Sequence, residues 1–234
     1  MEMSNYIQTE CPECDSSDAF TIYDDGAHCF SCNYSTKKVI NNMDKIKEIT
    51  TEFTAAQDNI QQIGELNSFA ITSRGISKQV VDYFGIKMAV NPDGSGGSHY
   101  YPYTRDNKVV AYKERRLPKD FLTHGDYKNL QLFGQSVATS GKIVVVTEGE
   151  LDACAVAQAF MDKYNKVFPV VSIPSATGTK SLLDHRSWLR RFESVVLLFD
   201  SDDAGNAAVE RAAKIIGAGK VKVGDLQGCK DPCE

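Results

Sequence analysis

The chain has 234 residues, of which 42% are hydrophobic and 24% charged, a composition that fits a globular protein of one large or two modest domains. No apolar run approaches the roughly 18 residues of a membrane span, and the first ten residues lack the basic start and apolar stretch of a signal peptide. We therefore expect a cytoplasmic protein with reduced cysteines and no membrane partner. Because 26 basic residues face 31 acidic ones, the net charge of -5 excludes nucleic-acid binding through overall charge, and a polyanion site needs a local basic patch.

Four of the seven cysteines form two Cys-x-x-Cys pairs with fourteen residues between them. Each pair can point both thiolates at one ion, and this spacing of two pairs is typical of a tetrahedral zinc site. A predicted hairpin, with strands at 20–23 and 27–30, brings the pairs together. We expect residues 1–36 to form a small β zinc ribbon around one structural zinc ion, whose ligands are Cys11, Cys14, Cys29 and Cys32.

The expected ribbon carries no positive side chain, since residues 1–36 contain neither lysine nor arginine. It cannot hold phosphates by releasing counterions. A contact with nucleic acid would have to use base edges or stacking, for which His28, Phe30, Tyr23 and Tyr34 are available. The alternative is that these aromatic side chains cover the small core of the ribbon.

The middle of the chain is predicted to hold a linker and then a mixed α+β subdomain. Residues 37–62 are polar and lack glycine and proline, which favours a flexible or partly helical linker. In the following segment, residues 63–141, Ser77 is a candidate N-cap and Gly85 a candidate terminator of a short helix. A glycine-rich loop is expected at 91–98, and strands at 100–104 and 109–115 are expected to form a hairpin.

From residue 142 onward, strands and helices alternate. Apolar runs predict strands at 143–147, 167–173, 195–199 and 221–223, and helical patterns lie at 151–161 and 204–216. This alternation predicts an α/β fold over residues 142–234, in which helices cover a mostly parallel sheet. Ligands bind such sheets at the carboxyl ends of the strands.

Acidic residues follow two of these strands. Glu148 comes directly after the first strand, and Asp200 and Asp202 follow the third. Because parallel strands end at one edge of the sheet, the three carboxylates can converge, and their repulsion calls for a cation that prefers hard oxygen ligands. We expect magnesium or manganese there, at a site for phosphate chemistry. Two neighbouring acids are interpreted as helix-terminus residues, with Asp203 as an N-cap and Glu150 as a first-turn acid.

Residues 105–128 hold a local excess of positive charge, with seven basic residues against four acidic ones. Lys113 and Arg115 are two residues apart on a predicted strand, so they project from one face and could hold a triphosphate or a template backbone. Each basic residue alone could equally be an ordinary solvated side chain. Beside an acidic metal site, the set favours a role in binding.

Two acidic motifs, Glu148-Gly-x-x-Asp152 and Asp200-x-Asp202, resemble those of the Toprim domain of primases, topoisomerases, RecR-like recombination proteins and some nucleases. Three further features point to a narrower group within the Toprim proteins. They are the four-cysteine ribbon, the segment Thr72-Ser-Arg-Gly-Ile-Ser77 and the segment Leu132-Phe-Gly134. Together they resemble the primase half of the bifunctional primase-helicases of short-tailed phages of the T7 type, which are related to the bacterial-type DNA primases. One departure is that His28 abuts Cys29, as in the bacterial knuckle, where the phage pattern has its histidine a few residues earlier.

The resemblance implies a DNA primase, a nucleotidyltransferase with DNA-directed RNA polymerase activity that makes short RNA primers on single-stranded DNA from ribonucleoside triphosphates. It implies that Asp200 and Asp202 hold magnesium and that Glu148 ligates a metal or handles a proton. Lys113 and Lys119 would neutralise the triphosphate during catalysis. The residues implied in nucleotide or template binding are Lys113, Arg115, Lys119, Lys128 and, in the ribbon, His28. The implied partners are a DNA polymerase and a replicative helicase, which would lie in cis beyond Glu234 or in a separate chain.

Other Toprim classes remain as alternatives. A RecR-like recombination protein is a DNA clamp without chemistry, and it would place its zinc site in mid-chain after a helix-hairpin-helix. A Toprim nuclease does not usually carry this ribbon, and a topoisomerase would need a tyrosine nucleophile in a much longer chain. The N-terminal position of the ribbon and the presence of all three acids favour the primase.

Overall fold

The computed structural model describes residues 7–14, 16–17, 19–23, 26–36, 59–90, 97–116, 120–139, 141–174 and 179–233. The chain divides into two units, residues 1–55, here called the N-terminal unit, and residues 56–234, here called the main unit. Each unit is described by itself. In the part of the chain that the structure describes, no helix combines the length and the apolar composition that a membrane crossing requires.

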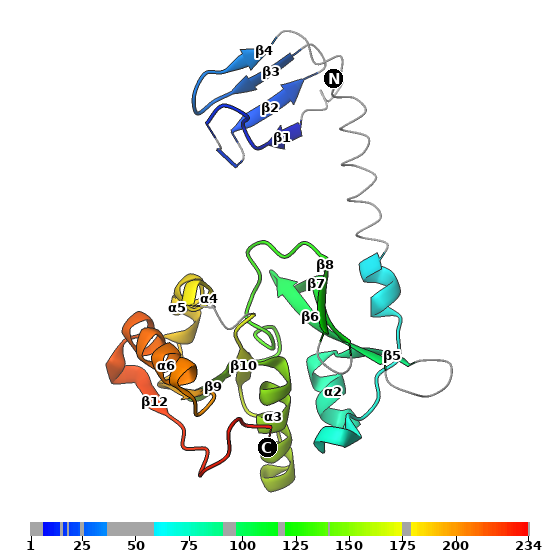
Figure 1. Ribbon diagram of the computed structural model, residues 1–234, viewed down its shortest axis with the longest axis vertical. Helices are drawn as coiled ribbons and strands as arrows, with labels where there is room; N and C mark the ends of the chain where they lie inside the picture. The colour runs from blue at the N-terminus through cyan, green and yellow to red at the C-terminus, as the bar shows by residue number, and fades with distance from the viewer. Residues whose placement is uncertain are drawn as a thin grey trace. The chain divides into compact units, whose positions relative to one another are not determined.

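The N-terminal unit is a four-stranded antiparallel sheet in the order β1-β2-β3-β4 (Figure 1). Its strands are β1 (Ile7–Thr9), β2 (Phe20–Tyr23), β3 (Gly26–Cys29) and β4 (Ser35–Thr36). The predicted hairpin is confirmed as β2 and β3, in which Phe20 pairs with Cys29, although β3 begins and ends one residue earlier than predicted. Its small core consists of Phe20 and Ala27 together with the two buried cysteines, Cys11 and Cys29. A core this small gives little stability by itself, and a metal bound by the cysteines would add a cross-link.

The first part of the main unit consists of a short helix and a four-stranded antiparallel sheet. The helix α2 (Lys78–Phe84) begins at Ser77, whose side chain accepts a hydrogen bond from the backbone of Val80, and ends at Gly85, which has a φ of 70°. Both predicted caps are therefore confirmed. The sheet has the order β5-β6-β7-β8, with β5 (Lys87–Val90), β6 (Gly97–Arg105), β7 (Lys108–Arg116) and β8 (Asp120–Gly125).

Three details of this region differ from the sequence prediction. Residues 59–64 are helical, so the last residues of the expected linker belong to a helix. The expected loop 91–98 is shorter, because β6 already begins at Gly97. Strand β8 was not predicted, and it pairs along β7 from Arg116 opposite Asp120 to Ala111 opposite Gly125.

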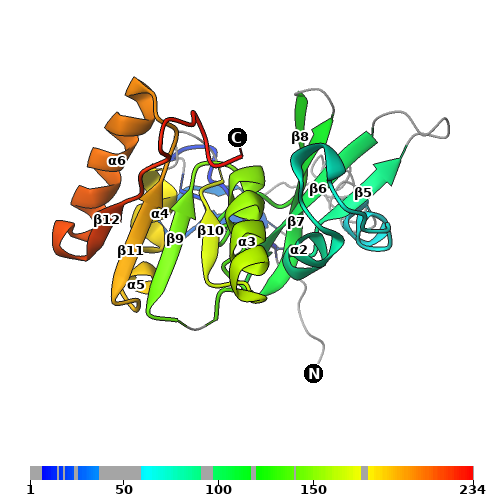
Figure 2. The ribbon, with the colours of Figure 1, turned by 90° about the horizontal axis from the view of Figure 1, so that it is seen from below.

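The second part of the main unit is a four-stranded sheet, parallel as predicted, in which the strand order is β10-β9-β11-β12 (Figure 2). The elements in chain order are β9 (Ile143–Thr147), α3 (Glu150–Tyr164), β10 (Val170–Ser172), α4 (Thr179–Asp184), α5 (Arg186–Leu189), β11 (Ser194–Leu198), α6 (Asp203–Ile216), the 3-10 helix η2 (Ala218–Lys220) and β12 (Val221–Val223). Alternate residues of β9 point to opposite faces of the sheet and belong to two different hydrophobic cores. Val145 packs with α3, whereas Val144 and Val146 pack with residues of α4, α5 and α6. Helices therefore cover both faces, which explains why these strands are apolar throughout.

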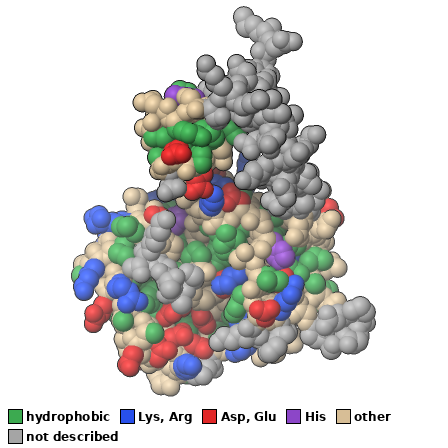
Figure 3. All heavy atoms as spheres, turned by 45° about the horizontal axis from the view of Figure 1, so that its top comes forward, with side chains coloured by type: hydrophobic (Ala, Val, Ile, Leu, Met, Phe, Trp, Pro, Cys, Tyr) green, Lys and Arg blue, Asp and Glu red, His purple; other side chains and the backbone are tan. Residues whose placement is uncertain are grey.

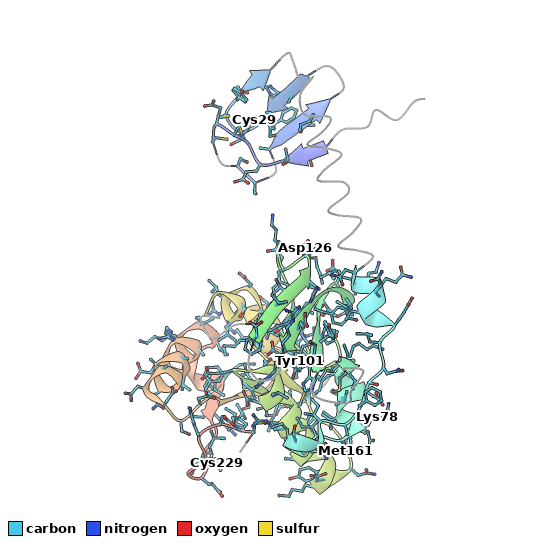
Figure 4. The ribbon with its side chains drawn as sticks, turned by 45° about the vertical axis from the view of Figure 1, so that its right-hand side comes forward. Cys29, Lys78, Tyr101, Asp126, Met161 and Cys229 are labelled. Carbon is cyan, nitrogen blue, oxygen red and sulfur yellow. The ribbon has the colours of Figure 1, made fainter. Side chains whose placement is uncertain are left out.

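The two sheets of the main unit share one core. Tyr101 and Tyr103 of β6 are buried together with Phe133 and with residues of α2 and α3. Tyr101, labelled in Figure 4, lies in the interior of the unit, where it is 1% exposed. Phe133 also forms a β-bridge to Ser172 of β10. The next residue, Gly134, has a φ of 78°, and a Cβ there would lie 2.8 Å from a carbonyl of β10, so the Leu-Phe-Gly segment requires its glycine.

Candidate active site and metal centre

The four predicted cysteines come together in the N-terminal unit. Their sulfur atoms all lie within 4.8 Å of one another, and the Cys11–Cys32 and Cys14–Cys29 sulfur pairs are 3.7 Å apart. A tetrahedral zinc ion with Zn–S bonds of about 2.3 Å requires sulfurs about 3.8 Å apart, so these two pairs already have the spacing that zinc requires. Four thiolates fill the coordination sphere and leave no position for a catalytic water.

The aromatic residues of the N-terminal unit divide between core and surface. Tyr34 stacks on Phe20 at a ring distance of 6.0 Å and is part of the small core. Phe30 is 64% exposed, and its ring meets His28 edge-on at 4.7 Å. The ring of His28 is fixed by a hydrogen bond of 2.7 Å between its Nδ1 and the hydroxyl of Ser35. His28 and Phe30 therefore form an ordered aromatic pair, of which Phe30 is open to a base. The side chain of Tyr23 lies outside the described residues.

The predicted strand-end acids emerge from neighbouring parallel strands. Because Thr147 of β9 is in register with Leu198 of β11, the segments that follow leave the same edge of the sheet. A side-chain oxygen of Glu148 accepts a hydrogen bond of 3.1 Å from the backbone N–H of Asp200. Gly205 allows this approach, since a Cβ there would lie 2.1 Å from the carbonyl oxygen of Asp200 and 3.1 Å from Glu148.

Asp202 serves as the N-cap of α6, and Asp203 is the first residue of that helix. The carboxylate of Asp202 accepts a hydrogen bond of 2.8 Å from the backbone of Gly205. The interpretation of Asp203 as the N-cap was therefore wrong by one residue, because the chain is still extended at Asp202. Among the described residues, the carboxylates at this edge are not gathered as tightly as the four thiols.

Burial and, to a smaller extent, neighbouring negative charges raise the pKa values of Glu148 and Asp152. Burial raises the pKa of Glu148, and the negative charges of Asp200 and Asp202 raise it further, against the hydrogen bond from the Asp200 backbone. Burial also raises the pKa of Asp152 to about 7, followed by the charges of Asp231 and Asp200. Carboxylates that hinder one another's ionisation are suited to a divalent cation, which would favour their charged forms. The set of hard oxygen donors therefore fits magnesium or manganese.

Asp152 and Asp231 are candidate site residues that the sequence analysis did not assign. Asp231 lies on the tail after β12, which returns to the carboxyl edge of the parallel sheet (Figure 2). The tail is fixed there by Ser201, which hydrogen-bonds the carbonyls of Lys230 at 2.8 Å and Cys229 at 3.1 Å. Asp152 was part of the quoted Toprim motif, but no local pattern marks Asp231. On the face that Figure 3 shows, acidic side chains gather at the lower left of the main unit, with lysine and arginine side chains beside them.

Lys113 and Arg115 lie on the same face of β7, as predicted. Both approach the ring of Phe121 on β8, with Lys113 Nζ 5.1 Å and the Arg115 guanidinium 5.6 Å from its centroid. Lys113 Nζ also lies 2.9 and 3.1 Å from the two carboxylate oxygens of Glu150. This ion pair places the ammonium group beside the turn from β9 to α3, two residues from Glu148. Within the described part of the chain, the buried Nε of Arg115 has no hydrogen-bond partner.

Glu150 is not merely a first-turn acid. It is 5% exposed, it pairs with Lys113, and it also accepts a hydrogen bond from the hydroxyl of the fully buried Tyr103. Its position in the first turn of α3 agrees with the sequence interpretation, which did not include the two partners because they lie on strands of the other sheet, more than thirty residues away in sequence.

The opposite face of β7 carries a separate polar network around Glu114. This side chain is 4% exposed and accepts hydrogen bonds from Ser98, from Arg116 at 2.9 Å and from His124 at 2.8 Å. The amide of Asn59 lies 3.1 Å from the other ring nitrogen of His124, which ties the helix at 59–64 to this face. Strand β7 thus carries the half-buried Lys113 and Arg115 on one face and is fixed by a buried carboxylate on the other.

Lys128 and Lys119 are the two remaining basic residues of the sequence prediction. Lys128 is exposed on the loop after β8, where its backbone contacts Asp126 and Arg105. Lys119 lies outside the described residues. The assignment of both residues to nucleotide or template binding stays a prediction.

Comparisons with known proteins agree with this geometry. Residues 145–234 match the Toprim-like family. The chain is 33% identical to the DNA helicase/primase of Enterobacteria phage T3 over 96% of its own length and spans 40% of the length of that relative. Among solved structures, it is similar to the primase domain of bacteriophage T7 in a complex with the lagging-strand DNA polymerase and an RNA/DNA hybrid. That match has a TM-score of 0.62 and 37% identity, and it covers 70% of this chain and 82% of the other.

A second solved structure covers both units. It is the primase fragment of the bacteriophage T7 primase-helicase, which matches with a TM-score of 0.65 and 30% identity over 98% of this chain and 94% of that one. The resemblance drawn from the sequence motifs is therefore confirmed. With its four-thiol ribbon and its Toprim sheet, this chain belongs to the family of DNA primases that includes the primase domain of the phage T7 primase-helicase.

Proposed function

We propose that this chain synthesises short RNA primers on single-stranded DNA from ribonucleoside triphosphates. The observation that carries the proposal is the placement of two kinds of group in one unit. Carboxylates gather at the end of a parallel sheet, and the ion pair of Lys113 with Glu150 holds a cation at the same turn. Phosphoryl transfer needs both, because negative charge builds up on the reacting phosphate and on the leaving pyrophosphate.

In the proposed reaction, the 3'-hydroxyl of one nucleotide attacks the α-phosphate of the next, and pyrophosphate leaves. Bound magnesium or manganese would supply Lewis-acid activation and charge neutralisation at the phosphates. Its candidate ligands are Glu148, Asp152, Asp200, Asp202 and Asp231. The raised pKa of Glu148 also makes it a candidate acceptor for the proton of the attacking hydroxyl. The proposed triphosphate and template contacts are Lys113, Arg115, Lys119 and Lys128.

The N-terminal unit is proposed to hold one structural zinc ion and to present the template. The described part of residues 1–36 carries acidic side chains and no basic one, so it cannot hold DNA by phosphate contacts. Stacking on the exposed ring of Phe30, beside the fixed ring of His28, is the contact that remains available.

The proposed partners follow from the relatives. The phage T3 relative is a helicase/primase, and the phage T7 primase domain has been solved with a lagging-strand DNA polymerase. We infer that this primase works with a replicative helicase, in cis or as a separate chain, and hands its primers to a DNA polymerase. Such an enzyme would work in the cytoplasm of a bacterial host.

The test is incubation of the full chain with single-stranded DNA libraries, labelled ribonucleotides and magnesium, followed by sizing of the products. Asp200→Ala and Asp202→Ala should lower synthesis by orders of magnitude without unfolding the protein, because each removes a surface oxygen ligand and the N-cap that Asp202→Ala also removes contributes only about 1 kcal/mol. Asp203→Ala is the matched control, since it changes the adjacent exposed acid and should retain synthesis. DNA binding without any synthesis would favour the RecR-like clamp, and degradation of the DNA would favour a Toprim nuclease.

A further inference from the structure

Glu150 is a buried carboxylate to which the proposed reaction assigns no direct part. It is 5% exposed at the start of α3 and contacts two side chains of the other sheet, Tyr103 on β6 and Lys113 on β7. Burying a carboxylate in this way costs several kcal/mol unless it is paired and hydrogen-bonded. Because burying Glu150 is unfavourable, its position beside the proposed phosphate site indicates a functional role.

Tyr103 holds Glu150 rigidly. Its side chain is fully buried, with its ring centroid 5.5 Å from that of Tyr127 and 6.1 Å from that of Phe133. The hydroxyl therefore has a fixed position, and its hydrogen bond orients the carboxylate of Glu150. The first turn of α3 adds a favourable helix dipole for the negative charge.

Glu150 in turn holds Lys113. A lysine side chain has four flexible bonds, and an ammonium group that must meet a phosphate loses rate if it is misplaced by about 1 Å. Here the ammonium is 2.9 and 3.1 Å from the two carboxylate oxygens of Glu150 and 3.4 Å from the carbonyl oxygen of Pro174. The ring of Phe121 also contacts the ammonium group. Three separate elements thus converge on one nitrogen atom.

We propose that Glu150, oriented by Tyr103, is a positioning residue that fixes the ammonium group of Lys113 where the nucleotide phosphates bind. The inference rests on the proposed function, in which Lys113 contacts the triphosphate. It has a distinctive consequence, because the carboxylate fixes the lysine and also offsets part of its charge. Removing the negative charge should strengthen the ground-state attraction between Lys113 and phosphate while loosening its geometry.

The experiment measures kcat and KM for ribonucleotides in the full chain carrying Glu150→Gln, which keeps the shape of the side chain. We expect kcat to fall on the order of 10- to 100-fold and KM to fall several-fold, because positioning is lost while electrostatic attraction increases. Tyr103→Phe removes only one hydroxyl and should lower kcat by a smaller factor. Asp82→Asn, which breaks the exposed pair with Lys78, is the control and should leave both constants unchanged.

A double-mutant cycle separates positioning from a general structural effect. In a Lys113→Met background, Glu150→Gln should have no further effect on kcat, since there is no ammonium group left to position. Folding of each variant is checked by the fluorescence of Trp188, the chain's one tryptophan. Should Glu150→Gln not fold, the same cycle is run with Tyr103→Phe.

Three outcomes would overturn the inference: an unchanged kcat in Glu150→Gln, an increase in KM, or independent effects that multiply in the double mutant. If Lys113→Met instead makes primers like the wild-type chain, the nucleotide role of Lys113 in the proposed function is what fails. The two failures are therefore distinguishable.

Discussion

Replacing Glu114 by glutamine should destabilise the main unit strongly at neutral pH and much less in acid. Burial raises the pKa of Glu114, but hydrogen bonds from Ser98, Arg116 and His124 outweigh it and lower the pKa from its ordinary 4.5 to about 2. A group whose pKa is depressed in the folded state stabilises that state when it is ionised. Glu114 lies on β7 between Lys113 and Arg115, so this network also supports the strand that carries both cations.

The size of the expected destabilisation follows from the pKa shift of Glu114. The difference of about 2.5 pKa units, at 1.36 kcal/mol per unit, corresponds to about 3.4 kcal/mol. Because Arg116 is half exposed and its pairing is screened by solvent, about 2 kcal/mol is the value we expect to measure. This stabilisation is complete above pH 4.5 and declines as the pH falls towards 2. Less than half of it should remain at pH 3.

Urea unfolding at pH 7 and at pH 3 measures this effect through the fluorescence of Trp188. Trp188 packs against Phe192 at a ring distance of 5.0 Å and belongs to the main unit, so the signal does not depend on unfolding of the N-terminal unit. Glu193→Gln is the control. Its carboxylate is 71% exposed and lies 3.9 Å from Lys142, so its loss should lower the free energy of unfolding by less than about 0.5 kcal/mol. Equal destabilisation of Glu114→Gln at both pH values would refute the reasoning.

Two further predictions concern the metal and the cations. The purified chain should contain about one zinc ion, which acid should release as the thiolates protonate, while the Trp188 signal stays unchanged; metal analysis that finds no zinc contradicts the four-thiol assignment. Arg115→Ala and Arg116→Ala form a matched pair on opposite faces of β7. The first should raise the nucleotide concentration needed for half-maximal synthesis roughly tenfold, whereas the second should lower stability and leave that concentration unchanged. Similar kinetic effects of both substitutions would contradict the assigned faces.

Local signals explain which parts of the structure the sequence predicted. Ser77 and Gly85 act on their own backbone, so the bounds of α2 could be read from them directly. The apolar runs that became β9 and β11 reflect burial on both faces of one sheet. The convergence of Glu148 with Asp200 followed from the rule that parallel strands end together, and the hydrogen bond between them agrees with it.

Long-range contacts explain the rest. Strand β8 is an edge strand whose residues are largely exposed, so its sequence lacks an alternating pattern and its structure comes from pairing with β7. Glu150 looked like a local helix acid because its partners, Tyr103 and Lys113, lie on the other sheet. Asp231 lies near the acids only because the tail is fixed to Ser201. None of these contacts can be predicted from a short stretch of sequence, because the partners are far apart in the chain.

The junction between the two units offers a last prediction. The expected linker, residues 37–62, would allow the main unit to be separated at residue 63. The contacts of residues 59–63 place the boundary of the main unit before residue 59. Asn59 bonds His124, Ile60 packs against the backbone at Gly125, and Ile63 is 4% exposed. Residues 56–234 should therefore fold as the full chain does, whereas residues 63–234 lose a helical turn and should unfold at a lower urea concentration.

The separated main unit also tests the role of the N-terminal unit. Residues 56–234 retain every described carboxylate and cation of the candidate site, so they should still join two ribonucleotides or extend a supplied dinucleotide. They should lose most of their preference for template sequence and most de novo initiation, because tethering no longer holds the exposed Phe30 ring and the zinc ribbon at high local concentration. Initiation at the same template sequences and with the same efficiency as the full chain would show that template selection resides in the main unit. Equal urea midpoints for residues 56–234 and 63–234 would show that the contacts of Asn59 and Ile60 contribute nothing to its stability.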